Sequence, residues 1–134
     1  MPLENNKQIA REFIEATFAR DAGRAAAVLS DDMTYTIGGL HPRFQRIWTK
    51  PDWCHYLELP TPFEDELELT IHSITAEADR VALEAECYGI ISESGQAYNN
   101  HYCFFFIVKE GLIQRIREYM DTHHVTDVLP LPGM

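Results

Sequence analysis

Two carboxylates near the end of the sequence, Glu118 and Asp121, have the residue type and the setting for proton-transfer chemistry. They stand in the run GLIQRIREYMD, which alternates like a strand, and they are three positions apart. Successive side chains of a strand point to opposite faces, so only one of the two can face a hydrophobic core. A buried carboxyl has a raised pKa and can act as a general acid or base near neutral pH.

Other reactive side chains are spaced less favourably. The histidines form no HxxxH or HExxH pair, and neighbouring His123 and His124 point apart in a strand or loop, so no metal is expected. No serine lies in a Gly-x-Ser-x-Gly turn, which argues against a serine hydrolase. Cys87 has no basic neighbour in the sequence to stabilise a thiolate, so it is expected to remain a small, unreactive side chain.

The overall composition limits the class of protein. A chain of 134 residues, 46% hydrophobic and 24% charged, fits a single globular domain over residues 1–134. The formal charge of -10 disfavours nucleic acid and anionic membrane surfaces as partners. Three cysteines without CxxC spacing, the absence of signal-peptide features and the lack of a long apolar run predict a cytoplasmic protein with no membrane span. No cofactor is expected.

Helical periodicity dominates the first part of the chain. Ile9, Phe13, Ile14 and Phe18 fall on one face, which predicts an amphipathic helix from Leu3 to about Arg20. Three further elements are expected before the middle of the chain: a short helix in DAGRAAAVLSDD (21–32) stopped by its Ser-Asp-Asp cluster, a short strand in MTYTIGG (33–39), and a helix in KPDWCHYLEL (50–59).

Strand periodicity dominates the second part. Four runs, at 67–77, 79–92, 96–109 and 112–121, are separated by turns of hairpin length and predict an antiparallel meander. Helices followed by a long antiparallel sheet indicate an α+β domain with its helices on one face of the sheet. The tail DTHHVTDVL is expected to add a last helical turn.

The order of these elements, and above all the run SGQAYNNHYCFFFIVKEGLIQRIREYMD (94–121), resembles the SnoaL-like and ketosteroid isomerase-like proteins. These belong to the nuclear-transport-factor superfamily of cystatin-like α+β folds, and the similarity extends distantly to limonene epoxide hydrolases. The resemblance implies a cone-shaped, strongly curved antiparallel sheet wrapped around the N-terminal helices, with a pocket inside. It specifies the reaction poorly, because this fold hosts isomerases, hydrolases, cyclases and binders.

The resemblance also selects between the two carboxylates, because the acid that follows the arginine projects into the pocket of the epoxide hydrolases, and this position is Glu118. Asp121 is then expected to cap a helix or end the strand. Strand parity and the resemblance together give the candidate site. Its expected catalytic residues are Glu118, Tyr35 and Tyr102, and its expected ligand-binding residues are Asn100, Tyr98, Cys87, Met120 and Trp53.

The chain departs from the known enzymes of the superfamily at two places. Ala85-Glu86-Cys87 stands where epoxide hydrolases have an arginine and a second acid, and Ile37 stands where ketosteroid isomerases have their base. The leading hypothesis is an isomerase, cyclase, hydratase or hydrolase that uses one carboxylate on a small apolar oxygenated substrate. The alternative is a non-catalytic small-molecule-binding module in which Glu118 and the tyrosines orient a ligand and no proton moves. An assembly domain is a third possibility.

The same parity leaves an aromatic and charged face on the outside of the sheet. If Tyr98, Asn100 and Tyr102 point inward, the neighbouring strands present an outward set: His101, Cys103, Phe105, Arg115, Arg117, Tyr119, Glu84, Glu86 and Tyr88. A monomer rarely exposes such a patch. A homodimer through this outer face is therefore expected.

Overall fold

The helices come first in the chain and the long antiparallel part of the sheet follows. A computed structural model describes residues 2–129, with one short 3-10 turn (Pro42–Phe44) in addition to its helices and strands. The elements are α1 (Pro2–Phe18), α2 (Ala22–Ala27), β1 (Leu29–Ile37), α3 (Lys50–Glu58), β2 (Glu68–Glu77), β3 (Arg80–Ile90), β4 (Ala97–Lys109), β5 (Leu112–Met120) and α4 (Thr122–Val128).

Local sequence explains how the helices begin. Helix α3 starts with a capping box, in which Thr49 and Asp52 bond each other's backbone N–H groups, and Pro51 occupies its first turn. Helix α4 starts at Asp121, whose side chain accepts from the His124 N–H, so the expected capping role of Asp121 is confirmed.

The second helix ends earlier than the sequence suggested. Helix α2 stops at Ala27, and the Ser-Asp-Asp cluster lies within β1 instead of terminating the helix. The reason is burial: Leu29 and Met33 are each only 1% exposed, and the backbone N–H of Ile113 bonds to the Val28 carbonyl, which aligns this segment with β5. Core packing therefore extends β1 across the polar cluster.

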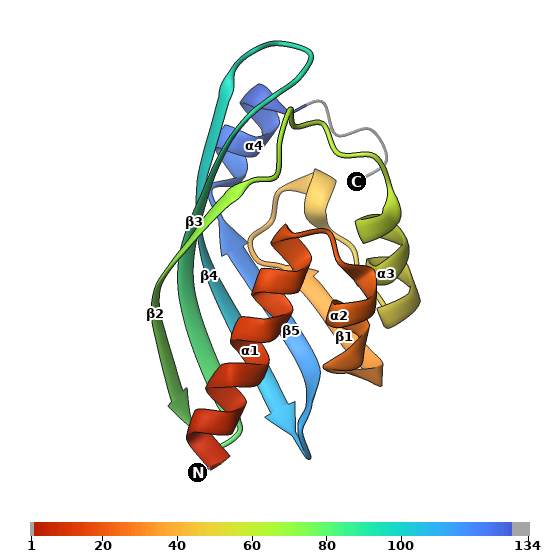
Figure 1. The fold of residues 1–134 in the computed structure, drawn as a ribbon, viewed down its shortest axis with the longest axis vertical. Coiled ribbons are helices and arrows are strands. Elements are labelled where there is room, and N and C mark those ends of the chain that lie inside the picture. Colours follow the sequence, from red (N-terminus) through yellow and green to blue (C-terminus); the bar gives the residue numbers. More distant parts are fainter. Residues whose placement is uncertain (1, 130–134) are drawn as a thin grey trace.

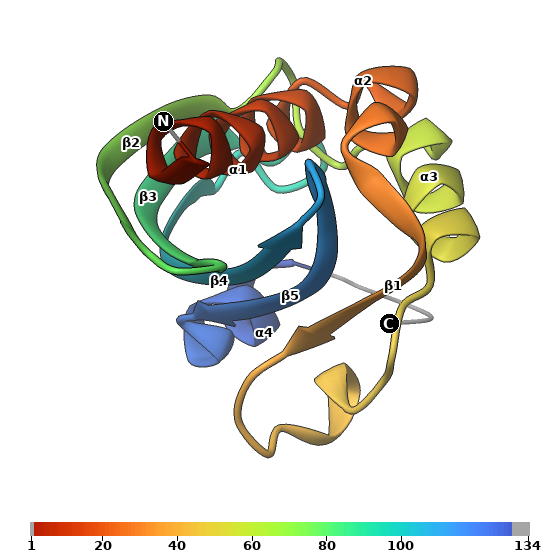
Figure 2. The same cartoon turned by 90° about the horizontal axis from the view of Figure 1, so that it is seen from below.

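The five strands form one curved, open sheet in the order β1-β5-β4-β3-β2. Strands β2 to β5 pair antiparallel, whereas β1 joins the far edge parallel to β5. The sheet curls around α1, with α2 and α3 beside β1 (Figures 1 and 2). This arrangement confirms the predicted α+β cone. Among the described residues, no helix is long and apolar enough to cross a membrane.

A bulge in β5 changes the strand parity that the sequence predicts. Val108 pairs with Ile113 and Ile107 with Arg115, so Gln114 is left over. Ile113 and Ile116 consequently both face the core, each 0% exposed, although simple alternation placed Ile113 outward with Arg115. That part of the prediction is wrong. Glu118 lies beyond the bulge, and its expected inward direction is unaffected.

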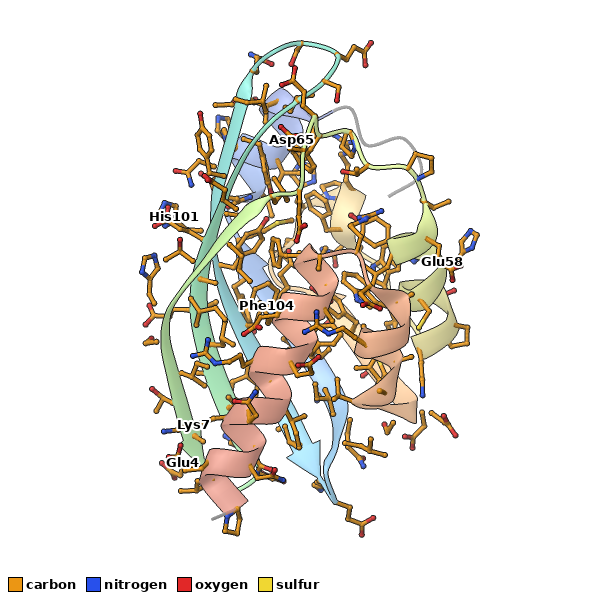
Figure 3. All side chains as sticks on the ribbon, in the orientation of Figure 1. Glu4, Lys7, Glu58, Asp65, His101 and Phe104 are labelled. Atoms are coloured by element: carbon orange, nitrogen blue, oxygen red, sulfur yellow. The ribbon has the colours of Figure 1, made fainter. Side chains whose placement is uncertain are left out.

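The two faces of the sheet differ sharply in chemistry. On β4 the side chains of Tyr98, Asn100, Phe104 and Phe106 are buried, whereas His101 is exposed. Figure 3 shows Phe104 directed toward the helices and His101 directed away from them. In the core, the ring of Phe13 on α1 lies 6.0 to 6.3 Å from aromatic rings of the sheet and α3.

Candidate active site

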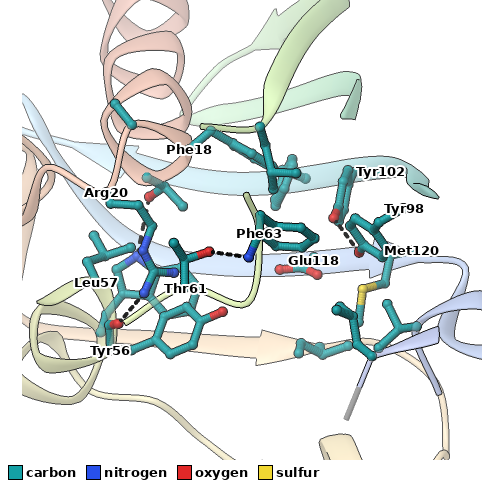
Figure 4. Close-up of a pocket in the computed structure, with 18 of the residues that line it drawn as sticks. Phe18, Arg20, Tyr56, Leu57, Thr61, Phe63, Tyr98, Tyr102, Glu118 and Met120 are labelled. Carbon is teal, nitrogen blue, oxygen red and sulfur yellow. Dashed lines mark hydrogen bonds between the residues drawn. The ribbon is translucent and has the colours of Figure 1, made fainter. Parts of the chain in front are cut away.

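A cavity of about 320 Å³ lies between the concave face of the sheet and the helices. Its walls are mainly aromatic, and its lining reaches the surface at the segment 61–67, where Thr61, Asp65 and Glu66 are exposed (Figure 4). Six of the eight sequence-predicted site residues line it together: Glu118, Tyr35, Tyr102, Tyr98, Met120 and Trp53. Such a hollow suits a small, mostly apolar ligand.

Glu118 is the buried acid of this cavity. It lies on β5, which has a strand on each side, is paired with Phe104 of β4 and Ile37 of β1, and is 8% exposed. Burial raises the pKa of Glu118 to about 7, while a hydrogen bond from the Tyr35 hydroxyl to its Oε1 atom opposes that rise. The carboxyl can therefore exchange a proton near neutral pH.

Tyr35 is held rigidly beside Glu118. Its backbone N–H and C=O both bond to Trp48, at 2.9 Å each, while its ring stacks on Trp53 with 4.1 Å between centroids. The Trp53 indole in turn donates to the Thr17 hydroxyl on α1. Burial, followed by the nearby Glu118 charge, raises the pKa of Tyr35 well above its usual value. The phenol thus stays protonated and acts as a donor.

Tyr98 and Tyr102 form a second polar position in the cavity. Their hydroxyls are 2.8 Å apart (Figure 4), and burial is the main reason that the pKa of each is raised. The Glu118 charge adds a smaller contribution to both shifts. Both phenols therefore remain neutral hydrogen-bonding groups.

Asn100 and Cys87, which the sequence suggested as ligand contacts, lie behind these tyrosines. The Asn100 amide bonds to the Tyr98 hydroxyl at 2.9 Å, and the Cys87 sulfur is 3.5 Å from the Tyr102 hydroxyl. Neither side chain lines the cavity. Burial also raises the pKa of Cys87, so it remains a thiol. Both residues act on the cavity through the tyrosine hydroxyls.

Arg20 is a cavity residue that the sequence analysis missed. Its Nη2 atom donates to the carbonyls of Tyr56 and Leu59, at 2.9 and 2.8 Å, and so ties the end of α3 to the end of α1 (Figure 4). Its backbone has a positive φ of 60°, a conformation that favours glycine. No sequence signal identifies such a residue, because its partners are backbone atoms 36 and 39 positions away.

Within residues 2–129, no group of three or more His, Cys, Asp or Glu side chains is arranged to hold a metal ion. On the outer face, His72 and His101 both lie beside the Glu86 carboxylate. The polar chemistry of the cavity thus comes mainly from one buried carboxyl and four phenols, those of Tyr35, Tyr56, Tyr98 and Tyr102.

Several solved structures share this fold. The chain superposes on an LEH-like epoxide hydrolase from M. tuberculosis with a TM-score of 0.76 and 23% identity, covering 95% of this chain and 90% of that one. An NTF2-like protein from Burkholderia xenovorans LB400 gives 0.73 and 20%, covering 93% and 95%. A protein with a ketosteroid isomerase-like fold from Catenulispora acidiphila DSM 44928 gives 0.74 and 16%, covering 92% and 93%.

At these identities the structural likeness establishes the fold and leaves the reaction open. No curated protein matches the chain. The sequence model of the SnoaL-like domain matches residues 10–116, which include the second half of α1, all of α2 and α3, and most of the sheet. The chain therefore belongs to the SnoaL-like domain family.

Proposed function

We propose that this protein is a cofactor-independent enzyme that moves a proton on a small, mostly apolar molecule containing an oxygen atom. The observation that carries the proposal is Glu118: a buried carboxyl with a pKa of about 7 that lines an aromatic cavity. A general base works best when its pKa lies near the working pH, and burial is the usual means of raising a carboxyl to that range.

The proposed reaction is the transfer of a proton between two carbons, or from carbon to oxygen. The Glu118 carboxylate removes a proton from a carbon next to a carbonyl, so the C–H bond breaks and the electron pair moves onto the carbonyl oxygen as an enolate. A hydroxyl of the Tyr98–Tyr102 pair donates to that oxygen. The protonated Glu118 then returns its proton at a second position, and no oxidant or reductant is needed.

The contacts of Tyr35 favour a supporting part for it in this reaction. Its hydroxyl donates to Glu118 and its ring is held by Trp53, so it orients the base and stabilises the charged form. This leaves Tyr102, with Tyr98, as the donor to the substrate oxygen.

The position of Glu86 favours one-acid chemistry over a two-acid relay. This residue stands closest in sequence to the second acid of epoxide hydrolases, but its carboxylate accepts from Asn99 and contacts His72 on the outer face. A single carboxyl suits proton transfer within one substrate better than activation of water by paired acids.

Hydrogen–deuterium exchange tests the proposal without knowledge of the natural substrate. A small bicyclic ketone such as 2-tetralone, with acidic C–H bonds beside its carbonyl, is first shown to bind by thermal shift and then incubated with the protein in D₂O. We expect catalysed exchange that increases as pH rises through about 7. Glu118→Gln should reduce it at least about a hundredfold while preserving binding.

Glu86→Gln is the matched control, because it removes a carboxylate of the same type from the outer face and should leave exchange unchanged. A non-catalytic binding module is the second candidate, since Tyr35 already satisfies Glu118 as a hydrogen-bond partner. Binding of the ketone without exchange above the solvent rate, in wild type and Glu118→Gln alike, would establish that reading instead.

A further inference from the structure

Asn100 on β4 has 0% exposure, and the orientation of its amide is fixed by backbone partners. Its Oδ1 atom accepts from the backbone N–H groups of His101 and Asp121, at 2.8 and 2.9 Å. A peptide N–H can only donate, so the atom facing both must be the oxygen. The Nδ2 atom consequently faces the Asp121 carbonyl at 3.2 Å and the Tyr98 hydroxyl at 2.9 Å.

This orientation sets the direction of the hydrogen bonds in the cavity. Because Nδ2 can only donate, the Tyr98 oxygen accepts from Asn100 and its own proton must go elsewhere. Tyr98 and Tyr102 together have two hydroxyl protons, and their mutual bond uses one. The other meets either the Cys87 sulfur, a weak acceptor 3.5 Å from Tyr102, or the cavity. Because sulfur is the weaker acceptor, a ligand oxygen in the cavity can take this proton.

We infer that Asn100 is a positioning residue that makes the Tyr98–Tyr102 pair a hydrogen-bond donor, so that the cavity selects ligands presenting an acceptor oxygen at this point. Carbonyl and ether oxygens fit, and a group that can only donate does not. The inference deepens the proposed function by defining the substrate class, but it rests only on ligand binding in the cavity and not on turnover.

A pair of probes with the same shape tests this inference. 2-Acetylnaphthalene and 2-isopropenylnaphthalene differ by replacement of C=O with C=CH₂, so only the first can accept a hydrogen bond. We expect the wild type to bind the ketone at least about tenfold more tightly, since one hydrogen bond in a buried site corresponds to roughly that factor. The carbonyl stretch of the bound ketone should move to lower frequency than in hydrocarbon solvent.

Variants show whether the ketone preference depends on the direction of the hydrogen bonds or only on the presence of the hydroxyls. Tyr102→Phe should keep the preference for the ketone, because the Tyr98 proton is then released from its partner. The double variant Tyr98→Phe/Tyr102→Phe should bind both probes equally. Asn100→Asp, measured above about pH 8, should also lose the preference, because an ionised carboxylate accepts the Tyr98 proton instead of donating to Tyr98.

Asn99→Asp is the matched control, since Asn99 points outward to Glu86 and the Cys87 carbonyl. It should keep both the preference and the frequency shift. Equal binding of the two probes by the wild type, or a full ketone preference in folded Asn100→Asp or in the double variant, would overturn the inference. These readouts concern binding alone, so they are independent of the exchange assay that tests Glu118.

Discussion

Tyr35 and Glu118 lie on the neighbouring parallel strands β1 and β5, and the tyrosine hydroxyl donates to the carboxyl within the cavity. Two effects on the Glu118 carboxyl oppose each other. Burial disfavours the charge on Glu118, and the hydrogen bond from Tyr35 favours it. The balance leaves the carboxyl near neutrality, and several measurable properties depend on it.

Removal of the Tyr35 hydroxyl should move the titration of Glu118 upward. In Tyr35→Phe the carboxylate loses its donor while its burial is unchanged, so its pKa should rise above about 7. The infrared band of the protonated carboxyl, followed against pH, reports this directly. Tyr119→Phe removes a hydroxyl from the outer face and is the control. An unchanged or lower midpoint in Tyr35→Phe would contradict the assigned hydrogen bond.

Glu118 should also make the protein less stable as pH rises. Its pKa is about 7 in the folded state against 4.5 for the free side chain, so between these values the folded state binds more protons and stability falls with increasing pH. Glu118→Gln removes this dependence and still offers Tyr35 an acceptor. The variant should match the wild type at about pH 4 and exceed it by up to about 3 kcal/mol above about pH 8.

Urea unfolding at several pH values measures this difference. The corresponding change at Glu86, Glu86→Gln, should give no stability gain at high pH, because that carboxylate is stabilised in its charged form by Asn99 and His72. A pH-independent gap between the wild type and Glu118→Gln would mean that Glu118 is not the titrating group.

The side-chain hydrogen bonds of Arg20 should stabilise the fold, whereas its positive φ should destabilise it. Arg20→Ala loses the two bonds to the end of α3 and should destabilise the fold by about 1–3 kcal/mol. Arg20→Gly loses the same bonds, but glycine adopts the φ of 60° without strain. The glycine variant should therefore be more stable than the alanine variant by about 0.5–1 kcal/mol. Thermal unfolding compares them, and a glycine variant weaker than the alanine variant contradicts the argument.

The hairpin between β4 and β5 offers a stabilising substitution. Its two turn residues, Glu110 and Gly111, have φ of 54° and 78°, which suits Asn-Gly far better than Glu-Gly. Glu110→Asn should therefore add about 0.5–1 kcal/mol to the free energy of unfolding. Gly111→Ala, which places a side chain at the second positive φ, should destabilise. Equal stability of Glu110→Asn and the wild type would argue against this turn geometry.

Much of the fold could be predicted from the sequence because its signals are local. The spacing of Ile9, Phe13 and Ile14 predicts α1, and alternation with hairpin-length turns predicts β2 to β5. The length of β1 and its parallel pairing with β5 depend on contacts between distant segments. The bulge at Gln114 has no local signal either, since it is defined only against the partner strand β4.

The candidate site was predicted unevenly for the same reason. Parity and family resemblance brought Glu118, Tyr35, Tyr98 and Tyr102 into one cavity, where the structure also places them. They did not distinguish residues that line the cavity from those that support it, such as Asn100. Alternation gives the direction of a side chain but says nothing about its depth or about which peptide groups satisfy it.

The hydrogen bonds between Asn100 and the start of α4 bear on which residues of the cavity lining can be replaced. Asn100 bonds to the backbone N–H and carbonyl of Asp121, so this link between β4 and the start of α4 does not depend on which side chain stands at position 121. Val125 and Leu129, which also line the cavity, take no part in this backbone link. Substitutions at these two positions should therefore change which ligands fit the cavity while Glu118 and the tyrosine pair keep their places. These positions are the starting point for redesign.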